Sequence, residues 1–318
     1  MASGAWASRL RALAASLPGV QPAATTPAAA AAMHRNLGLV AAEVARQAAQ
    51  GRTDDPPAVA GVCRQEHFEG PAFAAWCRRL NVAPVYHRKV WEFVWICRLL
   101  DERGALRPGA RGLGFGTGRE PLAALFAAQG CEVLATDQPA GDDARLWEAS
   151  GSWGGGLEGL ADPAVCPPEA FAERVRYRPV DMNAVPADLT GFDFTWSACA
   201  LEHLGSLEAG LRFVEVSVAC LRPGGVAVHT LEYNVSSNDA TVETGPTVVY
   251  RRRDLEDLVR RLEAAGHEVA PIDWDPGTGL LDRFVDVPPF GPDAHLRLLP
   301  SHGFVMASLA IAVRRGNR

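Results

Sequence analysis

The residues with the clearest chemical potential are three alternating glycines, Gly114, Gly116 and Gly118, followed further along the chain by Asp137. A glycine-rich turn lets the backbone reverse and approach a ligand with no Cβ in the way. The helix predicted after this turn, about residues 119–129, would direct its free N–H groups towards that ligand. An acid at the end of the next strand can accept hydrogen bonds from a ribose diol. Together these residues predict a binding site for a nucleotide-type cofactor.

The spacing of the glycines bears on which nucleotide is bound. A dinucleotide fingerprint requires G-x-G-x-x-G, and Arg119 stands in the place of its third glycine. The segment Gly114-Phe-Gly-Thr-Gly118 instead resembles the first motif of the class I S-adenosylmethionine-dependent methyltransferases. The resemblance implies S-adenosyl-L-methionine as cofactor. The cofactor contacts that it implies in this first part of the site are Gly114, Phe115, Gly116, Gly118, Asp137 and Gln138.

The resemblance continues downstream and covers about residues 86–315. Its motifs are F-D-x-x-W-S at 192–197, L-E-H-L at 201–204 and L-R-P-G-G at 221–225. An acid after the third strand of this family accepts a hydrogen bond from adenine, which implies cofactor contacts from Asp181 and Met182. Ser197 and Arg88 are the remaining implied contacts. Arg88 and its neighbour Lys89 have a second interpretation, as part of a solvated helix face.

Candidates for catalysis are expected where the fourth and fifth strands end. The sulfonium of the cofactor is a strong methyl electrophile, so the protein mainly has to align an acceptor and remove its proton. His203 is the first choice for general base, because an unperturbed imidazole titrates near neutrality. Glu202 and Glu232 are weaker candidates, and His203 has the alternative of bonding only to nearby backbone. Glu202, His203, His229 and Asp181 could in principle bind a divalent cation, but their spacing does not establish such a site, and no metal is expected.

The predicted fold is α/β: a seven-stranded mixed, mostly parallel sheet with helices on both faces, preceded by an N-terminal helical segment. By resemblance, its last strand runs antiparallel to the others. Three segments are expected: residues 1–58, an Ala-rich extension and linker that is partly disordered; 59–108, a helical cap; and 109–318, the Rossmann-like methyltransferase domain. The predicted strands cover 112–115, 132–136, 175–180, 192–197, 226–231, 267–274 and 304–313. Helices are predicted within 63–103 and at 119–129, 142–149, 206–221 and 253–265, and the long connection 275–302 is a candidate cover for the substrate mouth.

The charge and composition of the chain limit the kinds of partner and the cellular compartment that we expect. A formal net charge of −6 argues against binding nucleic acid through its phosphates. The seven cysteines form no C-x-x-C pair, which favours reduced thiols and a cytoplasmic protein. No apolar run reaches the length of a membrane span, so no membrane partner is expected. The Ala-rich start resembles a transit peptide in composition, although a plain extension is the simpler interpretation.

The predicted activity is O-methylation of a small-molecule or sugar-containing metabolite, with a small molecule or glycan as the only expected partner. Methyltransferases that act on bases or amides carry Asp or Asn-Pro-Pro-aromatic after the fourth strand, whereas this chain has Ser197-Ala-Cys-Ala. Alternatives left open are methyl transfer to nitrogen, sulfur or carbon, a nicotinamide-dependent oxidoreductase, and a non-catalytic binding module.

Overall fold

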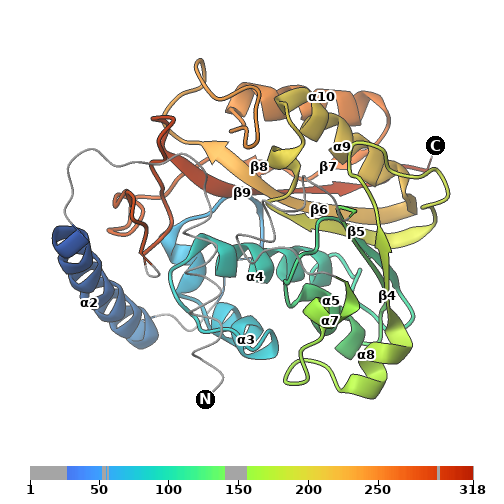
Figure 1. Ribbon diagram of the computed structural model, residues 1–318, viewed down its shortest axis with the longest axis horizontal. Helices are drawn as coiled ribbons and strands as arrows, with labels where there is room; N and C mark the ends of the chain where they lie inside the picture. The colour runs from blue at the N-terminus through green and yellow to red at the C-terminus, as the bar shows by residue number, and fades with distance from the viewer. Residues whose placement is uncertain (1–26, 52–54, 56, 140–155, 292–293, 318) are drawn as a thin grey trace.

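A single mixed sheet organises the molecule, as seen in a computed structural model that describes residues 27–51, 55, 57–139, 156–291 and 294–317 (Figure 1). The strands follow the order β4-β3-β2-β5-β6-β9-β1-β8, with β7 also paired to β9. The five strands from β4 to β6 are mutually parallel, and β9 runs antiparallel to β6. Their bounds are β2 Arg111–Gly114, β3 Glu132–Asp137, β4 Val175–Pro179, β5 Phe192–Ala198, β6 Leu221–Asn234 and β9 Met306–Arg314.

The predicted α/β fold class is confirmed, but the described residues form a sheet of nine strands instead of the seven predicted. The segment predicted as one strand over 267–274 is split into β7 (Glu268–Val269) and β8 (Ile272–Asp273), because Pro271 between them has no N–H for a ladder. The other additional strand is β1 (Ala60–Val62), which comes from the predicted helical cap and pairs with β9 and β8. Only a glycine fits at its centre, since a Cβ at Gly61 would lie 2.4 Å from a backbone oxygen of Asp273.

Helices cover both faces of the sheet (Figure 1). The first face carries α3 (Pro71–Arg79), α4 (Arg88–Asp101) and α5 (Leu122–Ala128), and the second carries α9 (Leu207–Ala219) and α10 (Arg252–Ala264). Strand β6 alternates accordingly: Val226 and Val228 pack into the first core, and Ala227 into the second. Shorter elements are η1 Gln65–Phe68, α7 Leu157–Leu160, α8 Pro168–Arg174 and η2 Leu201–His203.

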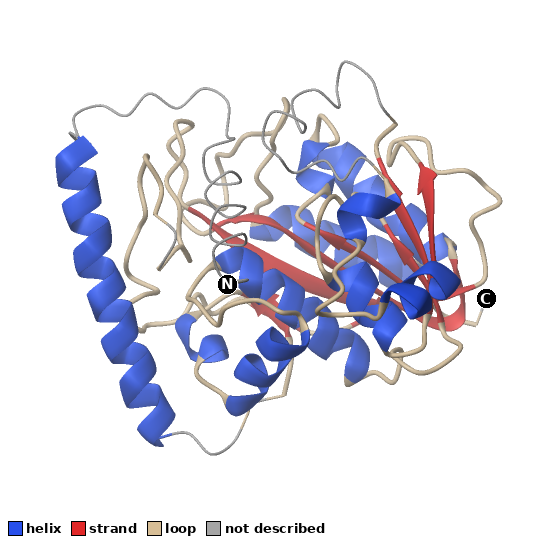
Figure 2. Ribbon diagram, turned by 60° about the horizontal axis from the view of Figure 1, so that its bottom comes forward, coloured by secondary structure: helices blue, strands red, loops and turns tan. Residues whose placement is uncertain are grey.

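In the described portion of the N-terminal part, the long helix α2 (Pro27–Gly51) lies at the side of the molecule (Figure 2). Leu37 and Ala41 are its buried apolar residues among those described. Residues 1–26 and the helix predicted at 142–149 lie outside the described residues. The division into extension, cap and methyltransferase domain stays a prediction.

Two further features concern the chain's chemistry. All seven cysteines are buried free thiols. No helix among the described residues combines the length and apolar character needed to cross a bilayer. The connection over 275–302 forms no helix or strand in its described part, yet it contributes Leu281, Leu296 and Leu298 to the buried apolar residues.

Candidate cofactor and acceptor site

The glycine turn at the end of β2 adopts a conformation that side chains would prevent. An ideal Cβ at Gly114 would lie 2.4 Å from the ring of Trp196, and one at Gly116 would lie 2.8 Å from the Cβ of Ala200. Gly116 and Gly118 also have positive φ angles, +58° and +49°. The prediction that these glycines permit a tight turn is therefore supported by the geometry, whereas the close approach of their backbone to a ligand stays a prediction.

Two threonines attach this turn to the neighbouring strand. The backbone N–H and the hydroxyl of Thr117 both donate to the carbonyl oxygen of Thr136, at 3.0 and 3.2 Å. In return, the Thr136 hydroxyl donates to the carbonyl oxygen of Gly114 at 2.7 Å. Both side chains are buried, so the bonds are protected from water and hold the turn against the end of β3.

The two predicted acids lie at the ends of adjacent parallel strands. Asp137 ends β3, is half-buried, and accepts hydrogen bonds from the N–H groups of Gly118 (3.2 Å) and Gln138 (2.8 Å). Asp181 follows β4, is exposed, and accepts from the N–H of Asn183 at 2.8 Å. The register places Asp137 opposite Pro179 at the end of β4, so both carboxylates lie at the same edge of the sheet as the glycine turn.

Between the turn and α5 lies a carboxyl that sequence reasoning missed. The predicted start of this helix at 119 was wrong: α5 begins at Leu122, because Pro121 disfavours helical backbone at Glu120 before it. Glu120 is buried and accepts a hydrogen bond from the indole N–H of Trp196 at 2.5 Å. Burial raises the pKa of Glu120 to about 8. An acid directly after the glycine motif was the only signal available in the sequence.

Two predicted cofactor contacts have side chains that face the interior instead. The ring of Phe115 packs edge-on against Phe213, with centroids 5.0 Å apart. The Ser197 hydroxyl lies 2.8 Å from Nδ1 of His229, inside strand β5. Both side chains are fully buried, so they are not available to a ligand, and a cofactor contact through the backbone atoms of these two residues stays a prediction. Met182 fits the prediction better, since its sulfur would be 3.4 Å from a Cβ at Gly116.

His229, on β6, is a structural residue. Its Nδ1 meets the Ser197 hydroxyl and its Nε2 meets the Ser217 hydroxyl, at 2.8 and 2.7 Å. Burial lowers the pKa of His229 to about 3, so the ring is neutral at pH 7. Both nitrogens are already used within the core.

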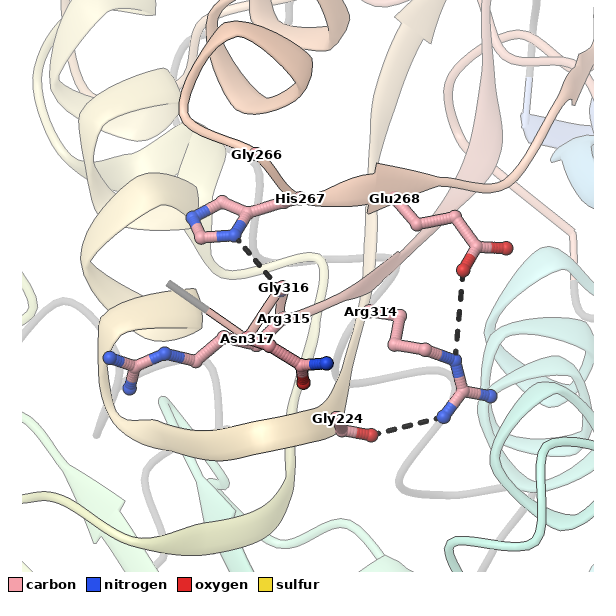
Figure 3. Close-up of a pocket in the computed structure, with 8 residues that line it drawn as sticks. All are labelled: Gly224, Gly266, His267, Glu268, Arg314, Arg315, Gly316 and Asn317. Atoms are coloured by element: carbon pink, nitrogen blue, oxygen red, sulfur yellow. Dashed lines mark hydrogen bonds and ion pairs between the residues drawn. The ribbon is translucent and has the colours of Figure 1, made fainter.

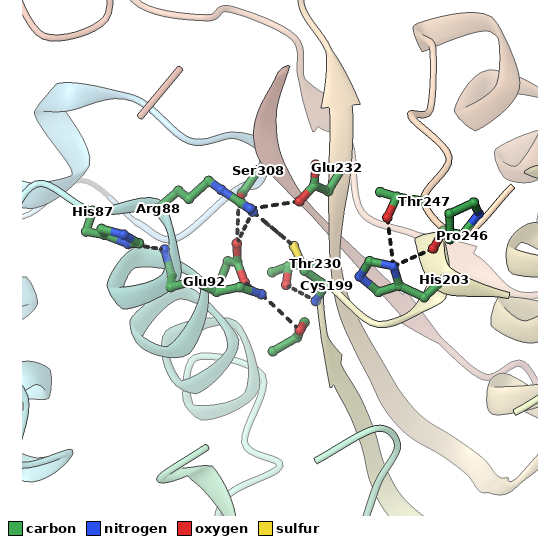
Figure 4. A network of polar contacts seen from close by, with 12 residues as sticks. His87, Arg88, Glu92, Cys199, His203, Thr230, Glu232, Pro246, Thr247 and Ser308 are labelled. Carbon is green, nitrogen blue, oxygen red and sulfur yellow. Dashed lines mark hydrogen bonds and ion pairs between the residues drawn. The ribbon is translucent and has the colours of Figure 1, made fainter. Parts of the chain in front are cut away.

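A buried ion network occupies the other half of the site (Figure 4). At the start of α4, the Arg88 guanidinium donates to Glu232 at 2.7 Å and to Glu92 at 3.1 Å. Lys89 bonds to the second oxygen of Glu92 at 2.8 Å and to the carbonyl oxygen of Ala198, where β5 ends, at 3.3 Å. Arg88 is only 7% exposed. The interpretation of Arg88 and Lys89 as a solvated helix face is therefore wrong. The predicted contact of Arg88 with the cofactor is not tested by these bonds, and because its guanidinium is engaged by Glu232 and Glu92, we assign Arg88 below to the acceptor side instead.

The charges within this network nearly balance. Burial alone would raise the pKa of Glu92, but Lys89 and Arg88 outweigh burial and the net shift is downward. Burial likewise opposes the charge of Arg88, yet Glu232 and Glu92 keep its pKa above the usual value. The Ser308 hydroxyl also donates to Glu92. Two cations and two carboxylates are thus held together out of water.

Glu202 belongs to the same region, but its carboxyl group lacks hydrogen bonds within the described residues. Its side chain is fully buried, and within the described part of the chain neither of its carboxyl oxygens has a hydrogen-bond partner. Burial, followed by the nearby Glu232, raises the pKa of Glu202 to about 8. The Oε2 atom of Glu232 is also without a partner among the described residues. An unpaired buried carboxyl is costly for folding, which is typical of a group kept for function.

His203 lies beside these carboxyls on η2. Its Nδ1 is 2.9 Å from the carbonyl oxygen of Pro246 and 3.2 Å from the hydroxyl of Thr247 (Figure 4). Because a carbonyl only accepts, Nδ1 carries the proton and Nε2 is the basic nitrogen. Burial lowers the pKa of His203 to about 4, so the expectation that it titrates near neutrality is not met. The backbone contact that was the alternative for His203 is present.

The chain turns sharply between β5 and these two residues. Cys199 has φ +49°, which is rare for a residue with a side chain, and its N–H donates to both the carbonyl and the hydroxyl oxygens of Thr230. The Cys199 sulfur is 3.8 Å from the Arg88 guanidinium. Burial raises the pKa of its thiol well above the ordinary value, so Cys199 is not a reactive thiolate.

A shallow hollow of about 300 Å³ lies elsewhere, between Gly224, the start of β7 and the end of β9 (Figure 3). Val226 pairs with Arg314, so this hollow is at the amino ends of the parallel strands. None of the predicted site residues lines it. In the part of the chain that the structure describes, no group of three or more His, Cys, Asp or Glu side chains is arranged to hold a metal ion.

No protein-family model and no curated protein sequence matches the chain. Solved structures similar to it include S-adenosylmethionine-dependent methyltransferases. One, from Mesorhizobium loti, is 14% identical, with 74% of this chain and 100% of that chain covered and a TM-score of 0.43. The [4+2]-cyclase SpnF is 18% identical over 70% of this chain and 80% of that chain, with a TM-score of 0.44.

Phosphoethanolamine N-methyltransferase 2 of Haemonchus contortus, solved in complex with S-adenosyl-L-methionine, is 13% identical, and the TM-score is 0.40. The match covers 69% of this chain and about half, 51%, of that one. The activities named here are those of the matched proteins.

Proposed function

We propose that the protein is an S-adenosylmethionine-dependent methyltransferase that methylates a hydroxyl group of a small-molecule or sugar-containing metabolite. The observation that carries this proposal is a convergence at one edge of the sheet. The glycine turn after β2, Asp137 at the end of β3 and Asp181 after β4 lie beside the titratable groups that follow β5. Open α/β sheets bind their ligands at this edge.

The residues present fit the proposed cofactor. A Cβ at Gly116 would lie 2.8 Å from the Cβ of Ala200, so glycine lets the turn pass close to the segment that follows β5. The half-buried Asp137 offers carboxylate oxygens at the end of the neighbouring strand. In the proposal, Asp137 accepts from the ribose hydroxyls, Asp181 from the adenine amino group, and the backbone of 114–118 lies along the remainder. The bound cofactor would supply an electrophilic methyl group.

The protein's own contribution would be to orient the acceptor and receive its proton. We assign His203 as the general base, because its tautomer presents Nε2 as the basic nitrogen and its ring is neutral at pH 7. Arg88 and Lys89 hold Glu92 and Glu232 in place around the acceptor, which excludes water from the reacting groups.

Glu202 is the second candidate base, favoured by its two unpartnered oxygens and its raised pKa. The pH dependence of kcat separates the two assignments. With His203 as base, the pKa of about 4 predicts a flat profile from pH 6 to 9. With Glu202 as base, the rate rises up to about pH 8, where the carboxyl becomes ionised.

The activity is tested by incubating the protein with cofactor labelled in its methyl group and a panel of acceptors that offer hydroxyl, amine or thiol groups. Labelled product from hydroxyl acceptors is expected, and His203→Ala should lower the rate by about 10²-fold while leaving cofactor affinity unchanged. Labelling confined to amines or thiols would overturn O-methylation. Oxidation of a nicotinamide cofactor, or absence of any transfer together with tight partner binding, would favour the oxidoreductase or the binding module.

A further inference from the structure

Four residues that the catalytic assignment does not use form a connected group: His34 on α2, His87 before α4, and Asp286 and His295 in the 275–302 connection. We propose that this group, the Asp286 clasp, is a positioning device that holds the first turn of α4 and thereby sets the place of Arg88 in the acceptor site. The role for the acceptor rests on the proposed function, whereas the mechanical role does not.

The backbone of His295 forms hydrogen bonds with the residues on both sides of His87. Its N–H donates to the carbonyl oxygen of Tyr86 at 2.9 Å, and its carbonyl oxygen accepts from the N–H of Arg88 at 3.1 Å. Its ring stacks on the ring of His87, with centroids 4.6 Å apart and 23° between the planes. The backbone and the side chain of one residue therefore fix the residue that precedes α4.

His87 in turn holds the first turn of α4 through two hydrogen bonds. Its Nδ1 accepts a hydrogen bond from the N–H of Lys89 at 3.1 Å, which caps the first turn, and its carbonyl oxygen accepts from the N–H of Trp91. The proton is consequently on Nε2, which is buried and has no partner among the described residues. A buried unpaired N–H disfavours this ring position, so the stacked His295 is needed to keep the ring there.

Asp286 joins the clasp together. Its fully buried carboxylate bonds to Nδ1 of His295 at 2.6 Å, to the N–H of Gly291 at 3.0 Å and to Nε2 of His34 at 3.2 Å. Gly291 allows the close approach of α2, because a Cβ there would lie 2.7 Å from the His34 ring. Segments far apart in the sequence thus meet at one carboxylate.

The Asp286 clasp affects the acceptor site through the first turn of α4. Arg88 and Lys89 extend from that turn to Glu232 on β6 and to the end of β5. A shift of the turn would lengthen these bonds, because both partners belong to the sheet. We therefore infer that weakening the clasp displaces Arg88 without touching the glycine turn.

Hydrogen exchange of backbone amides tests the mechanical claim without any assay of activity. In His295→Ala, the amides of Lys89 and Trp91 are expected to exchange at least about tenfold faster, while those of α9 keep their rates. His295→Gln retains a donor for Asp286 and a flat group for stacking, so it should restore most of the protection. His267→Ala, at the hollow of Figure 3, is the control and should leave α4 unchanged.

Unchanged exchange in α4, or equal acceleration throughout the protein, would overturn the clasp, as would a Gln variant as unprotected as the Ala variant. The link to the acceptor predicts that His295→Ala raises the KM for the acceptor at least tenfold more than it changes the affinity for S-adenosylhomocysteine. Equal changes in both would refute that link. If no acceptor is methylated by the unaltered protein, the proposed function fails while the exchange result still decides the clasp.

Discussion

The side of the site that we propose for the cofactor, at the ends of β2, β3 and β4, differs from the side that we propose for the acceptor, at the ends of β5 and β6. The difference is in how many of their polar groups have hydrogen-bond partners. On the cofactor side, Thr117, Thr136 and Asp137 bond to backbone atoms of the turn. On the acceptor side, Glu202 and one oxygen of Glu232 have no partner among the described residues. The polar groups named on the first side are satisfied within the fold, whereas on the second side buried carboxyl oxygens are left over, and in our proposal a bound acceptor uses them.

The strongest test of this difference is removal of the cation that balances the acceptor side. Arg88→Met should lower the free energy of unfolding by about 3–5 kcal/mol, because Glu232 and Glu92 lose a buried partner. Denaturant titration measures it. Arg252→Met is the matched control: its exposed pair with Glu256 should contribute less than about 1 kcal/mol. Similar losses in both variants would contradict a buried network.

Glu202→Gln should make the protein more stable, because it removes a buried acid whose oxygens have no partner among the described residues. The pKa of Glu202 is raised to about 8 from the model-compound value of 4.5, so the folded state favours the protonated carboxyl. Its contribution to stability is therefore complete below about pH 4.5 and is lost as the pH rises to 8.

The advantage of the glutamine variant should accordingly grow over that interval, to a few kcal/mol at roughly 1.4 kcal/mol for each pKa unit. Thermal or chemical unfolding at several pH values measures the difference. An advantage that does not change with pH would show that Glu202 is not an unpaired buried acid in the folded protein.

On the cofactor side the expected effect on stability is smaller and geometric. Gly116→Ala should cost about 1–2 kcal/mol from its positive φ, with a further cost from the contact with Ala200. Gly104→Ala is the control that measures the cost of a positive φ without the cost of a close contact. Gly104 has φ +69°, and a Cβ there would meet nothing within 4 Å. Equal destabilisation, with cofactor affinity intact in both variants, would show that the close approach at Gly116 has no role in binding.

Local sequence signals predicted the parts of the site that local geometry determines. The glycine turn, Asp137 and Asp181 follow from turn chemistry and strand periodicity, and these were placed at one edge of the sheet. The burial of Arg88 and Lys89 had no such signal, since a charged pair at a helix start is usually solvated. Their partner Glu232 lies on β6, which runs three residues beyond the predicted end at 231.

The Asp286 clasp and strand β1 were missed for a related reason. Both depend on pairing between residues more than two hundred positions apart, such as His34 with Asp286 and Gly61 with Ala310. A three-residue strand that contains glycine has no recognisable periodicity. Likewise, the core position of Ser197 depends on His229, which lies on the adjacent strand.

The central claim is that the glycine turn and Asp137 bind S-adenosylmethionine, and calorimetric titration with S-adenosylhomocysteine tests it most directly. We predict saturable binding to the unaltered protein, no binding of NADH, and affinity weakened by about 1–3 kcal/mol in Asp137→Ala but not in the exposed control Asp188→Ala. Binding of NADH, no binding of S-adenosylhomocysteine, or an affinity unaffected by Asp137→Ala would contradict the claim.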